Sequence, residues 1–399
     1  MSELMTSEQN ASPDSESLLF KADLYHQAGN LKEATDLYRS IIEMDCNHTK
    51  AHKKLFDIKK NAGNYERVVT AYNDFLTVPE KKTENKENNL PDNKKITQPK
   101  FSVIIPVRNN KLLTLKCLRS VAFTFSFLTK DTEYILINDD SDPKHGIIDL
   151  FLKFREQVKG AVKIINSKKH LHYTGSFSYG LSQSTGDNII FLSNDMMITP
   201  EFVKTLLEVS AQDQQIGIVR GTSQYTDSHN EYIIVPPFPV LDYKDILRFS
   251  AYIADCYQYT REENNILSGD AILIKKAVVD KIGILDTRFF GYFGDPDYGL
   301  RAQRAGFKLV CAKGAWLHHE GAGHIKGQSK EYTQLMSNRR DLVQAAYKQF
   351  REKWGEKSLQ PEYTDTTHID FEALKDQKET IIDIYENPAK LDYSHVELL

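Results

Sequence analysis

Short runs of apolar and β-branched residues alternate with longer amphipathic stretches through the middle of the chain. Four runs have the length of a strand: 101–107 (FSVIIPV), 134–138 (YILIN), 162–166 (VKIIN) and 188–195 (NIIFLSND). Helical patterns separate them, at 112–124, at 147–158 and over the segment FSYGLSQSTG. Continuous apolar runs are typical of parallel strands that are buried on both faces. The alternation predicts a βαβαβαβ order and an α/β fold with a largely parallel sheet.

The N-terminal part of the chain has a helical pattern that repeats. The segments HQAGNLKEATDLYRSII and KNAGNYERVVTAYNDFL share an A-G-N turn, and Gly29 and Gly63 are 34 residues apart. This period resembles that of tetratricopeptide repeats, in which paired helices stack on their neighbours. Because an array usually needs three repeats for stability, we expect these two to pack on the rest of the protein or on a protein partner. The alternative is a plain pair of helical hairpins without a binding role.

Composition divides the chain into five segments. We expect a disordered N-terminus at 1–16, tetratricopeptide-like helices at 17–78, a linker at 79–100, an α/β domain at 101–355 and a C-terminal tail at 356–399. The linker assignment rests on its many Lys, Glu and Asn residues, which cannot bury a core. The tail has no clear pattern.

Overall composition excludes several classes of protein. With 399 residues, 40% of them hydrophobic, the chain can build more than one core. Its net charge of -4 is unlike the basic excess of nucleic-acid-binding proteins. Four scattered cysteines without CxxC spacing argue against a zinc site or a disulfide framework. Since the sequence shows neither a signal peptide nor a transmembrane segment, we expect a cytoplasmic protein.

Polar residues gather where the predicted strands end. The first strand is followed by Pro106-Val107-Arg108-Asn109, the second by Asn138-Asp139-Asp140-Ser141, and the fourth by Ser193-Asn194-Asp195. Ligands of such sheets bind beyond the carboxyl ends of the strands. Carboxylate oxygens suit Mg²⁺ and Mn²⁺, which bridge diphosphate oxygens. The pattern therefore predicts a site for a divalent cation and a nucleotide.

Five segments together resemble the family 2 glycosyltransferases with the GT-A fold, in order and in approximate spacing. They are FSVIIPVRNN, YILINDDSDP, SFSYGLSQSTGDNIIFLSND, LSGDAILIKKAVVDKIGILDTRFFGYFGDPDYGLRAQRAGFKLV and LHHEGAG. The resemblance covers 101–355 and implies a doubly wound mixed sheet that binds a nucleotide-sugar donor. Each motif alone is weak, but five in order are specific.

The resemblance also implies which residues bind the donor. These are Pro106, Val107, Arg108, Asp139, Asp140, Ser193, Asn194 and Asp270. Asp139 and Asp140 are expected beside the nucleotide base, and Asp270 near the sugar hydroxyls. Four positions depart from the family pattern: Asn138 and Ser193 replace aspartates, Ser178 replaces an asparagine, and Gly294 replaces the first acid of a pair. The donor is therefore left open among UDP-, dTDP- and GDP-sugars.

The metal ligands and the catalytic base follow from the same resemblance. Asp195 matches the metal-binding end of the D-x-D element, together with one histidine of the pair His318-His319. An ungapped count favours His319, whereas the local HHEG match favours His318, which we place first. Asp295 matches the catalytic base, and displacement at an anomeric carbon needs a carboxylate to take the acceptor proton. Asp297 is expected to fix this loop or to contact the acceptor, unless it only caps a helix that begins at residue 298.

The aromatic segment 225–259 falls where the family's acceptor-side region belongs. We expect its rings either to stack on a sugar or to pack in a core. We predict an inverting glycosyltransferase that uses Mn²⁺ or Mg²⁺ and transfers a sugar to a hydroxyl of a saccharide or protein acceptor. Such reactions belong to cell-surface polysaccharide synthesis or protein glycosylation. The alternative is a degenerate transferase-like scaffold that binds proteins through its helical repeats.

Overall fold

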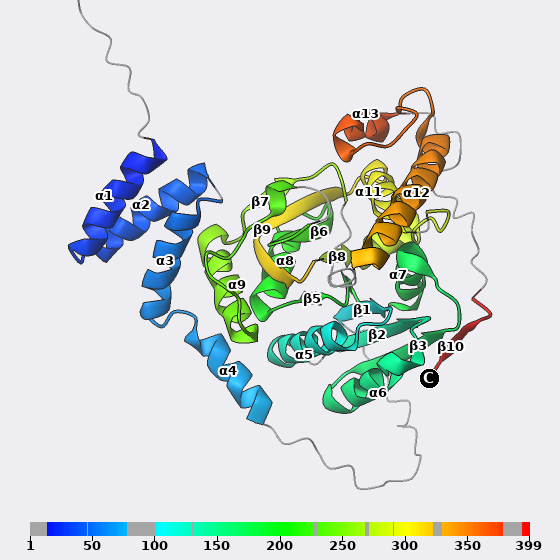
Figure 1. Ribbon diagram of the computed structural model, residues 1–399, viewed down its shortest axis with the longest axis horizontal. Helices are drawn as coiled ribbons and strands as arrows, with labels where there is room; N and C mark the ends of the chain where they lie inside the picture. Colours follow the sequence, from blue (N-terminus) through cyan, green and yellow to red (C-terminus); the bar gives the residue numbers. More distant parts are fainter. Residues whose placement is uncertain are drawn as a thin grey trace, which may run out of the picture.

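Four helices precede an α/β domain in the computed structural model (Figure 1). The structure describes residues 14–45, 47–77, 100–129, 131–226, 230–267, 271–289, 291–321, 329–377 and 393–399, and in the helix that begins at residue 329 it describes side chains from residue 339 onward. The expected linker, apart from Lys100, lies outside this part of the chain, as do Cys46 and Asp270.

The N-terminal helices form two hairpins. They are α1 (Ser15–Gln27), α2 (Leu31–Met44), α3 (Thr49–Asn61) and α4 (Glu66–Thr77). Gly29 and Gly63 occupy the two A-G-N turns with φ of 78° and 75°. A Cβ at either position would meet no neighbouring atom, so this left-handed backbone is the reason for glycine. Helix α1 begins before residue 17, because the side chain of Asp14 caps its first turn.

The second unit is built on a sheet of ten strands. The strands are β1 (Phe101–Val107), β2 (Thr132–Asp139), β3 (Ala161–Ser167), β4 (Asn188–Leu192), β5 (Met196–Met197), β6 (Ile216–Ser223), β7 (Arg261–Glu263), β8 (Ala271–Lys275), β9 (Lys308–His319) and β10 (Val396–Leu398). Their order is β10-β3-β2-β1-β4-β8-β6-β9-β5, and β7 pairs with β9. Strands β1 to β4 run parallel, whereas β8 and β10 are antiparallel to their neighbours, so the sheet is mixed.

Helices cover both faces of this sheet. They are α5 (Lys111–Leu128), α6 (Ile147–Gln157), α7 (His172–Gln183), α8 (Pro200–Ala211), α9 (Tyr243–Tyr257), α10 (Lys276–Ile282), α11 (Gly294–Arg304), α12 (Ser329–Trp354) and α13 (Phe371–Asp376), with single turns at η1 (Pro143–His145), η2 (Asn230–Tyr232) and η3 (Thr366–His368). The predicted βαβαβαβ order is present from β1 to β4.

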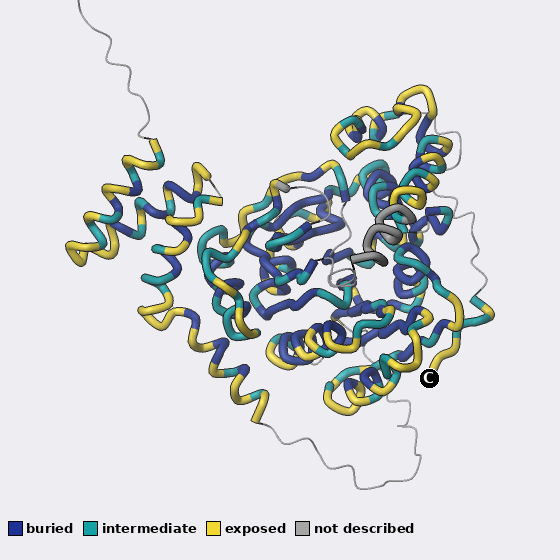
Figure 2. Tube along the Cα trace, viewed as in Figure 1, coloured by how far each residue is buried: buried dark blue, intermediate teal, exposed yellow. Residues whose placement is uncertain are grey.

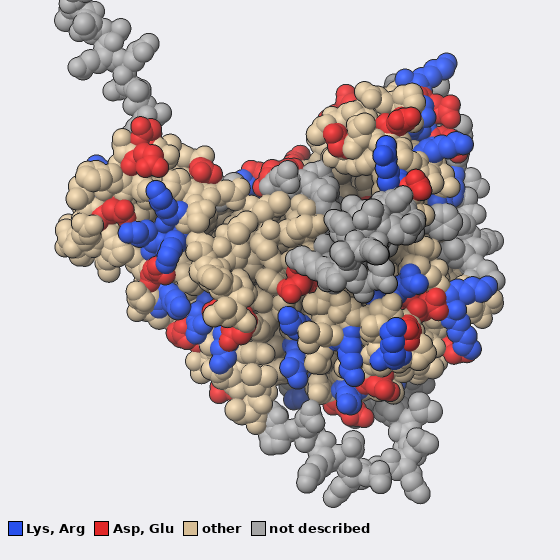
Figure 3. All heavy atoms as spheres, in the orientation of Figure 1, with Lys and Arg blue, Asp and Glu red and all other residues tan. Residues whose placement is uncertain are grey.

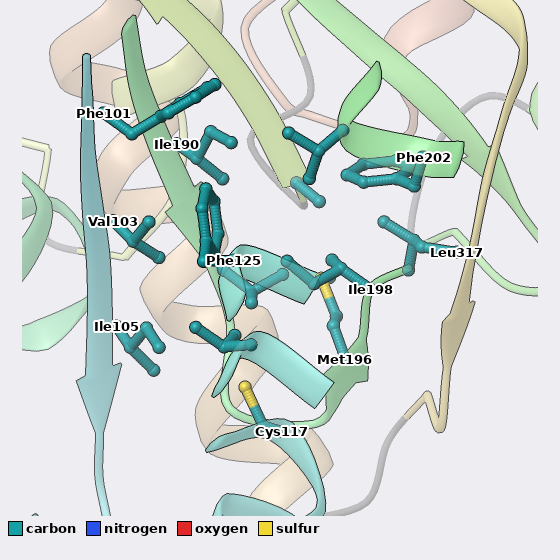
Figure 4. Packing of buried hydrophobic residues seen from close by; sticks show 14 of the residues in the cluster. Phe101, Val103, Ile105, Cys117, Phe125, Ile190, Met196, Ile198, Phe202 and Leu317 are labelled. Atoms are coloured by element: carbon teal, nitrogen blue, oxygen red, sulfur yellow. The ribbon is translucent and has the colours of Figure 1, made fainter. Parts of the chain in front are cut away.

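The core consists of two apolar layers separated by the sheet. Alternate residues of β1, such as Phe101 and Val103, pack with α5, α6 and α8 on one face (Figure 4). Ile104 points to the other face, where α7, α10 and α11 pack. The central strands β1, β2 and β4 are therefore buried along nearly their whole length, as Figure 2 shows. Burial on both faces explains why these strands are continuous apolar runs in the sequence.

Part of the aromatic segment 225–259 packs in a core. In α9, Phe249 and Tyr252 are fully buried, and they pack against Phe56 of α3. The Tyr252 hydroxyl lies 2.8 Å from Nδ1 of His52. The rings therefore join the N-terminal helices to the α/β domain, which is the core-packing alternative.

Residues after the predicted end of the α/β domain are part of it. Helix α13 packs with α12 in a separate apolar cluster that includes Trp354 and Phe371. Strand β10 adds an antiparallel edge to β3, with Val396 opposite Ser167. The segment 356–399, which has no clear sequence pattern, thus extends both the sheet and its helical cover. Among the described residues, no helix has the combined length and apolar character that a membrane crossing requires.

Candidate functional site

The strand ends expected to hold the donor lie at one edge of the sheet. Strands β2, β1 and β4 are adjacent and parallel, so their carboxyl ends share that edge. Because β1 lies between the other two, the ends of β2 and β4 are two strand spacings apart, roughly 10 Å. The two acidic segments thus flank the end of β1.

Hydrogen bonds join the loop after β1 to the loop after β2. The backbone N–H of Asn109 donates to Oγ of Ser141 (2.8 Å), and the N–H of Asp142 donates to Oδ1 of Asn109 (2.8 Å). Asn109 and Asp140 both have positive φ, at 61° and 55°, which asparagine and aspartate tolerate better than most residues. The sequence of these loops therefore suits their close packing.

Four of the expected donor-binding residues in or beside these loops differ in accessibility. Arg108 and Asp140 are exposed, and Pro106 is half-buried. The side chain of Val107 is buried in the core below the sheet. The backbone of Val107, rather than its side chain, therefore borders the end of β1.

Asp139 lies under the loop that precedes α7. Only 4% of the residue is exposed. Its Oδ2 is 2.9 Å from Nδ1 of His170, and its Oδ1 accepts a hydrogen bond from the backbone N–H of Leu171 (2.5 Å). Both carboxylate oxygens of Asp139 thus hold this loop in place. Asp139 would therefore affect a bound ligand indirectly, by positioning His170.

The segment after β4 is a tight turn against α5. The amide Nδ2 of Asn194 donates to Oγ1 of Thr114 (3.0 Å), and the N–H of Met196 donates to the carbonyl of Ser193 (3.2 Å). Strand β5 then pairs with the end of β9, and the N–H of Glu320 donates to the carbonyl of Asp195 (3.0 Å). Asn194 therefore anchors the turn, and the turn brings Asp195 to the end of β9.

His319, not His318, faces Asp195. Nε2 of His319 lies 3.4 Å from Oδ2 of Asp195. The other ring nitrogen, Nδ1, is 3.0 Å from the carbonyl of Tyr225, to which it donates. That hydrogen bond fixes the tautomer whose lone pair is on Nε2, the arrangement that proteins use to orient a histidine ligand.

His318, which we placed first, is engaged with other side chains and does not face Asp195. Its Nδ1 accepts from Nε2 of Gln224 (2.9 Å), and its Nε2 donates to Oε2 of Glu320 (3.0 Å). Burial lowers the pKa of His318, against the opposing effect of Glu320. Neighbouring residues of a strand point to opposite faces, so only one of the two histidines can meet Asp195.

The pair Asp195 and His319 fits a divalent cation that is shared with a substrate. Two ligands at right angles, each about 2.1 Å from an ion, lie roughly 3 Å apart, close to the separation of these atoms. Within the described ranges no group of three or more His, Cys, Asp or Glu side chains could hold a metal. Mg²⁺ and Mn²⁺ commonly take only one or two protein ligands and complete their coordination with phosphate oxygens and water. The donor set matches that chemistry.

Asp295 stands in the first turn of α11, beside an unusual backbone. The preceding Phe293 has a φ of 65°, a rare conformation for a bulky residue that is often found at functional sites. Gly294 lies against α7, and a Cβ there would be 2.6 Å from Oγ1 of Thr174. This contact explains why glycine replaces the first acid of the family's usual pair. The helix N-terminus favours the ionised form of Asp295.

Asp297 is enclosed by protein groups. It is fully buried, and its Oδ2 is 3.0 Å from Nε of Arg301. Its Oδ1 lies 2.6 Å from Nζ of Lys353 and accepts from Nε1 of Trp354 (3.0 Å). All of its partners are protein groups, so Asp297 fixes the loop and α11, which is the other role expected of it.

The structure adds residues that the sequence analysis did not select. Tyr363 is half-buried near Asp295, and its pKa is raised by burial, by the charge of Asp365 and by that of Asp295. The guanidinium carbon of Arg339 lies over the ring of Tyr292, 5.8 Å from the ring centroid. His170 and His172 could have been noticed as an H-x-H element before α7, but Tyr363 lies in a segment without a recognisable motif.

The mixed sheet with helices on both faces has the architecture of the GT-A fold. Residues 102–283 match the family described as Glycosyl transferase family 2. The chain is 23% identical over 237 residues to the O-antigen biosynthesis protein RfbC of Myxococcus xanthus, which covers 56% of this chain. It spans only 18% of the length of that relative.

Several solved structures are similar. One is the mannosyltransferase PcManGT of Pyrobaculum calidifontis in complex with GDP-Man and Mn²⁺, with 13% identity and a TM-score of 0.45, covering 74% of this chain and 75% of that one. Another is GalNAc-T7 with UDP, GalNAc and Mn²⁺, with 15% identity and a TM-score of 0.43, covering 60% and 48%. A third is residues 1–349 of S. aureus TarS, with 15% identity and a TM-score of 0.40, covering 63% and 72%.

Proposed function

We propose that this protein is an inverting, metal-dependent glycosyltransferase that moves a sugar from a nucleoside-diphosphate sugar to a hydroxyl of a saccharide or protein acceptor. The proposal is carried by the facing pair Asp195 and His319, whose atoms are 3.4 Å apart. Mn²⁺ or Mg²⁺ bound there would neutralise charge that develops on the diphosphate leaving group. The likeness to an O-antigen biosynthesis protein favours a cell-surface polysaccharide as the product.

The chain's own residues account for the rest of the reaction. The acceptor hydroxyl oxygen forms a bond to the anomeric carbon while the bond from that carbon to the diphosphate breaks, and the bonding electrons leave with the diphosphate. Asp295 takes the hydroxyl proton as the new bond forms. A single displacement of this kind inverts the anomeric centre. The hydrogen bond from His319 to the Tyr225 carbonyl keeps the imidazole oriented.

Two variants separate binding from chemistry. In the full chain, Asp195→Asn should weaken the Mn²⁺-dependent binding of UDP, GDP or dTDP, measured by calorimetry with and without EDTA. Asp295→Asn should bind the same nucleotide with normal affinity. It should cleave the corresponding sugar nucleotide at least about 100-fold more slowly, because a general base typically contributes that much. Asp280→Asn, an exposed carboxylate on α10, is the control.

The scaffold alternative makes the opposite prediction. A degenerate domain would neither bind the three nucleotides in the presence of Mn²⁺ nor release nucleotide from UDP-, GDP- or dTDP-sugars. A turnover that falls less than about tenfold in Asp295→Asn would contradict the role of that residue while leaving the metal site intact.

A further inference from the structure

A small pocket lies where the loop before α7 meets β10, the strand that the sequence pattern did not predict. Its volume is about 130 Å³, and its walls are formed by residues 169–172, by Gly175 and Thr287, and by His395. Pockets that enclose a whole drug-sized ligand usually measure roughly 300–1,000 Å³. This pocket therefore suits one end of a larger ligand.

Its position is at the end of β2. His170, which lines the pocket, is 2.9 Å from the carboxylate of Asp139, and its ring centroid is 3.9 Å from that of His172. Thr174, which precedes the pocket residue Gly175 in α7, lies against Gly294, the residue before Asp295. The pocket therefore lies beside the end of β2, and α7 links its wall to the turn that carries Asp295.

His395 brings unused hydrogen-bonding capacity to this pocket. Within the described part of the chain both of its ring nitrogens are buried without a hydrogen-bond partner. Burying a polar group without a hydrogen-bond partner is unfavourable, and a ligand that supplies the missing hydrogen bonds removes that penalty. The backbone around it is held firmly, since the N–H of Lys168 donates to the His395 carbonyl (3.2 Å) and β10 pairs with β3.

We propose that β10 completes the nucleotide site and that His395 hydrogen-bonds the nucleoside end of the donor. This inference rests on the proposed function. A neutral imidazole offers one donor and one acceptor, as do the edges of nucleobases and the hydroxyls of ribose. Lys169 on the pocket wall favours an anionic ligand such as a nucleotide. The small volume matches a nucleoside end rather than a whole sugar nucleotide.

Binding of free nucleotides tests the inference. We expect the full chain to bind at least one of UDP, GDP and dTDP in calorimetry, and His395→Leu to weaken that binding about tenfold, while His395→Gln retains most of it. Glu397→Gln is the control: it changes an exposed side chain of β10 that pairs with Lys168, and it should bind nucleotide like the wild type. Thermal unfolding of each variant checks that the fold is retained.

Hydrogen exchange gives a second readout that needs no variant. Whichever of the three nucleotides binds should slow amide exchange in residues 393–399. Amide exchange in the edge strand β7 should stay unchanged. Normal nucleotide affinity in folded His395→Leu, or binding without any protection of β10, would overturn the inference. If the wild-type chain binds none of the three nucleotides, the proposed function itself fails.

Discussion

At the scale of single residues, hydrogen-bond partners decide which groups can do chemistry. His318 and His319 are adjacent, yet only His319 directs a nitrogen toward Asp195, because Gln224 and Glu320 occupy both nitrogens of His318. Asp295 and Asp297 are separated by one residue, yet Asp297 is enclosed by cationic and indole groups. Residue type alone does not distinguish the members of either pair.

The two histidines should therefore differ in metal binding. In His319→Ala, we expect the affinity for Mn²⁺ in the presence of UDP to fall at least tenfold, since even outer partners of metal ligands contribute that much. His318→Ala should have a much smaller effect. Titration of Mn²⁺ followed by electron paramagnetic resonance measures both variants. The reverse order of losses would contradict the assignment of His319.

Gly294 offers a second residue-scale prediction. In Gly294→Ala the new Cβ meets Oγ1 of Thr174 at 2.6 Å, so we expect a loss of about 1–3 kcal/mol in the free energy of unfolding. Thr174→Ala removes that oxygen, and the double variant should recover most of the loss. Chemical denaturation of the four proteins gives the coupling. Additive effects would show that this contact is not the cause.

At the scale of elements, a buried ionic cluster joins the end of α12 to α11 and to the loop before it. Nζ of Lys353 lies 2.9 Å from Oδ2 of Asp286 and 2.6 Å from Oδ1 of Asp297, and all three residues are buried. Burial raises the pKa of Asp286, but hydrogen bonds from Arg288 and the charge of Lys353 outweigh it and hold the pKa below its ordinary value. This contribution to stability is present at neutral pH and is lost as the pH falls through the lowered pKa.

Removing the shared cation should destabilise the domain and disturb α11. Lys353→Met leaves two buried carboxylates less neutralised, so we expect a loss of about 3–5 kcal/mol in unfolding free energy. Lys53→Met breaks an exposed pair with Asp57 on α3 and should cost no more than about 1 kcal/mol. Denaturant titration compares the two. Equal losses would mean that the cluster does not brace α11.

At the scale of the whole molecule, the N-terminal helices are docked on the α/β domain. Phe56 packs on Phe238 of the segment before α9 with ring centroids 4.5 Å apart, and Arg248 of α9 pairs with Glu66 of α4 (2.8 Å). Figure 3 shows acidic and basic side chains interspersed over the visible surface. Phe56, Phe249 and Tyr252 belong to one apolar cluster, and ion pairs of Arg39 and Lys59 with Asp255 of α9 add charged contacts between the two parts. This contact meets the expectation that two repeats alone need a neighbouring surface.

The docking can be tested with a matched pair of phenylalanines. Phe56 is 3% exposed and Phe20 of α1 is 69% exposed. Phe56→Ala should cost about 3–5 kcal/mol at this contact and speed amide exchange in α3, whereas Phe20→Ala should change neither. Exchange in β2, inside the central sheet, serves as the internal reference. Unchanged exchange of α3 in folded Phe56→Ala would contradict the docking.

The sequence by itself determined the strands β1 to β4, the two helical hairpins and the positions of Asp195 and Asp295, because local periodicity, turn glycines and ordered motifs are written along the chain. It did not determine which of two adjacent histidines meets Asp195, nor that Asp297 is enclosed. Pairing of β5 with β9 decides the first, and the return of α12 onto α11 decides the second. The role of β10 also came only from the tertiary structure, since a short edge strand owes its place to a partner strand far away in the sequence.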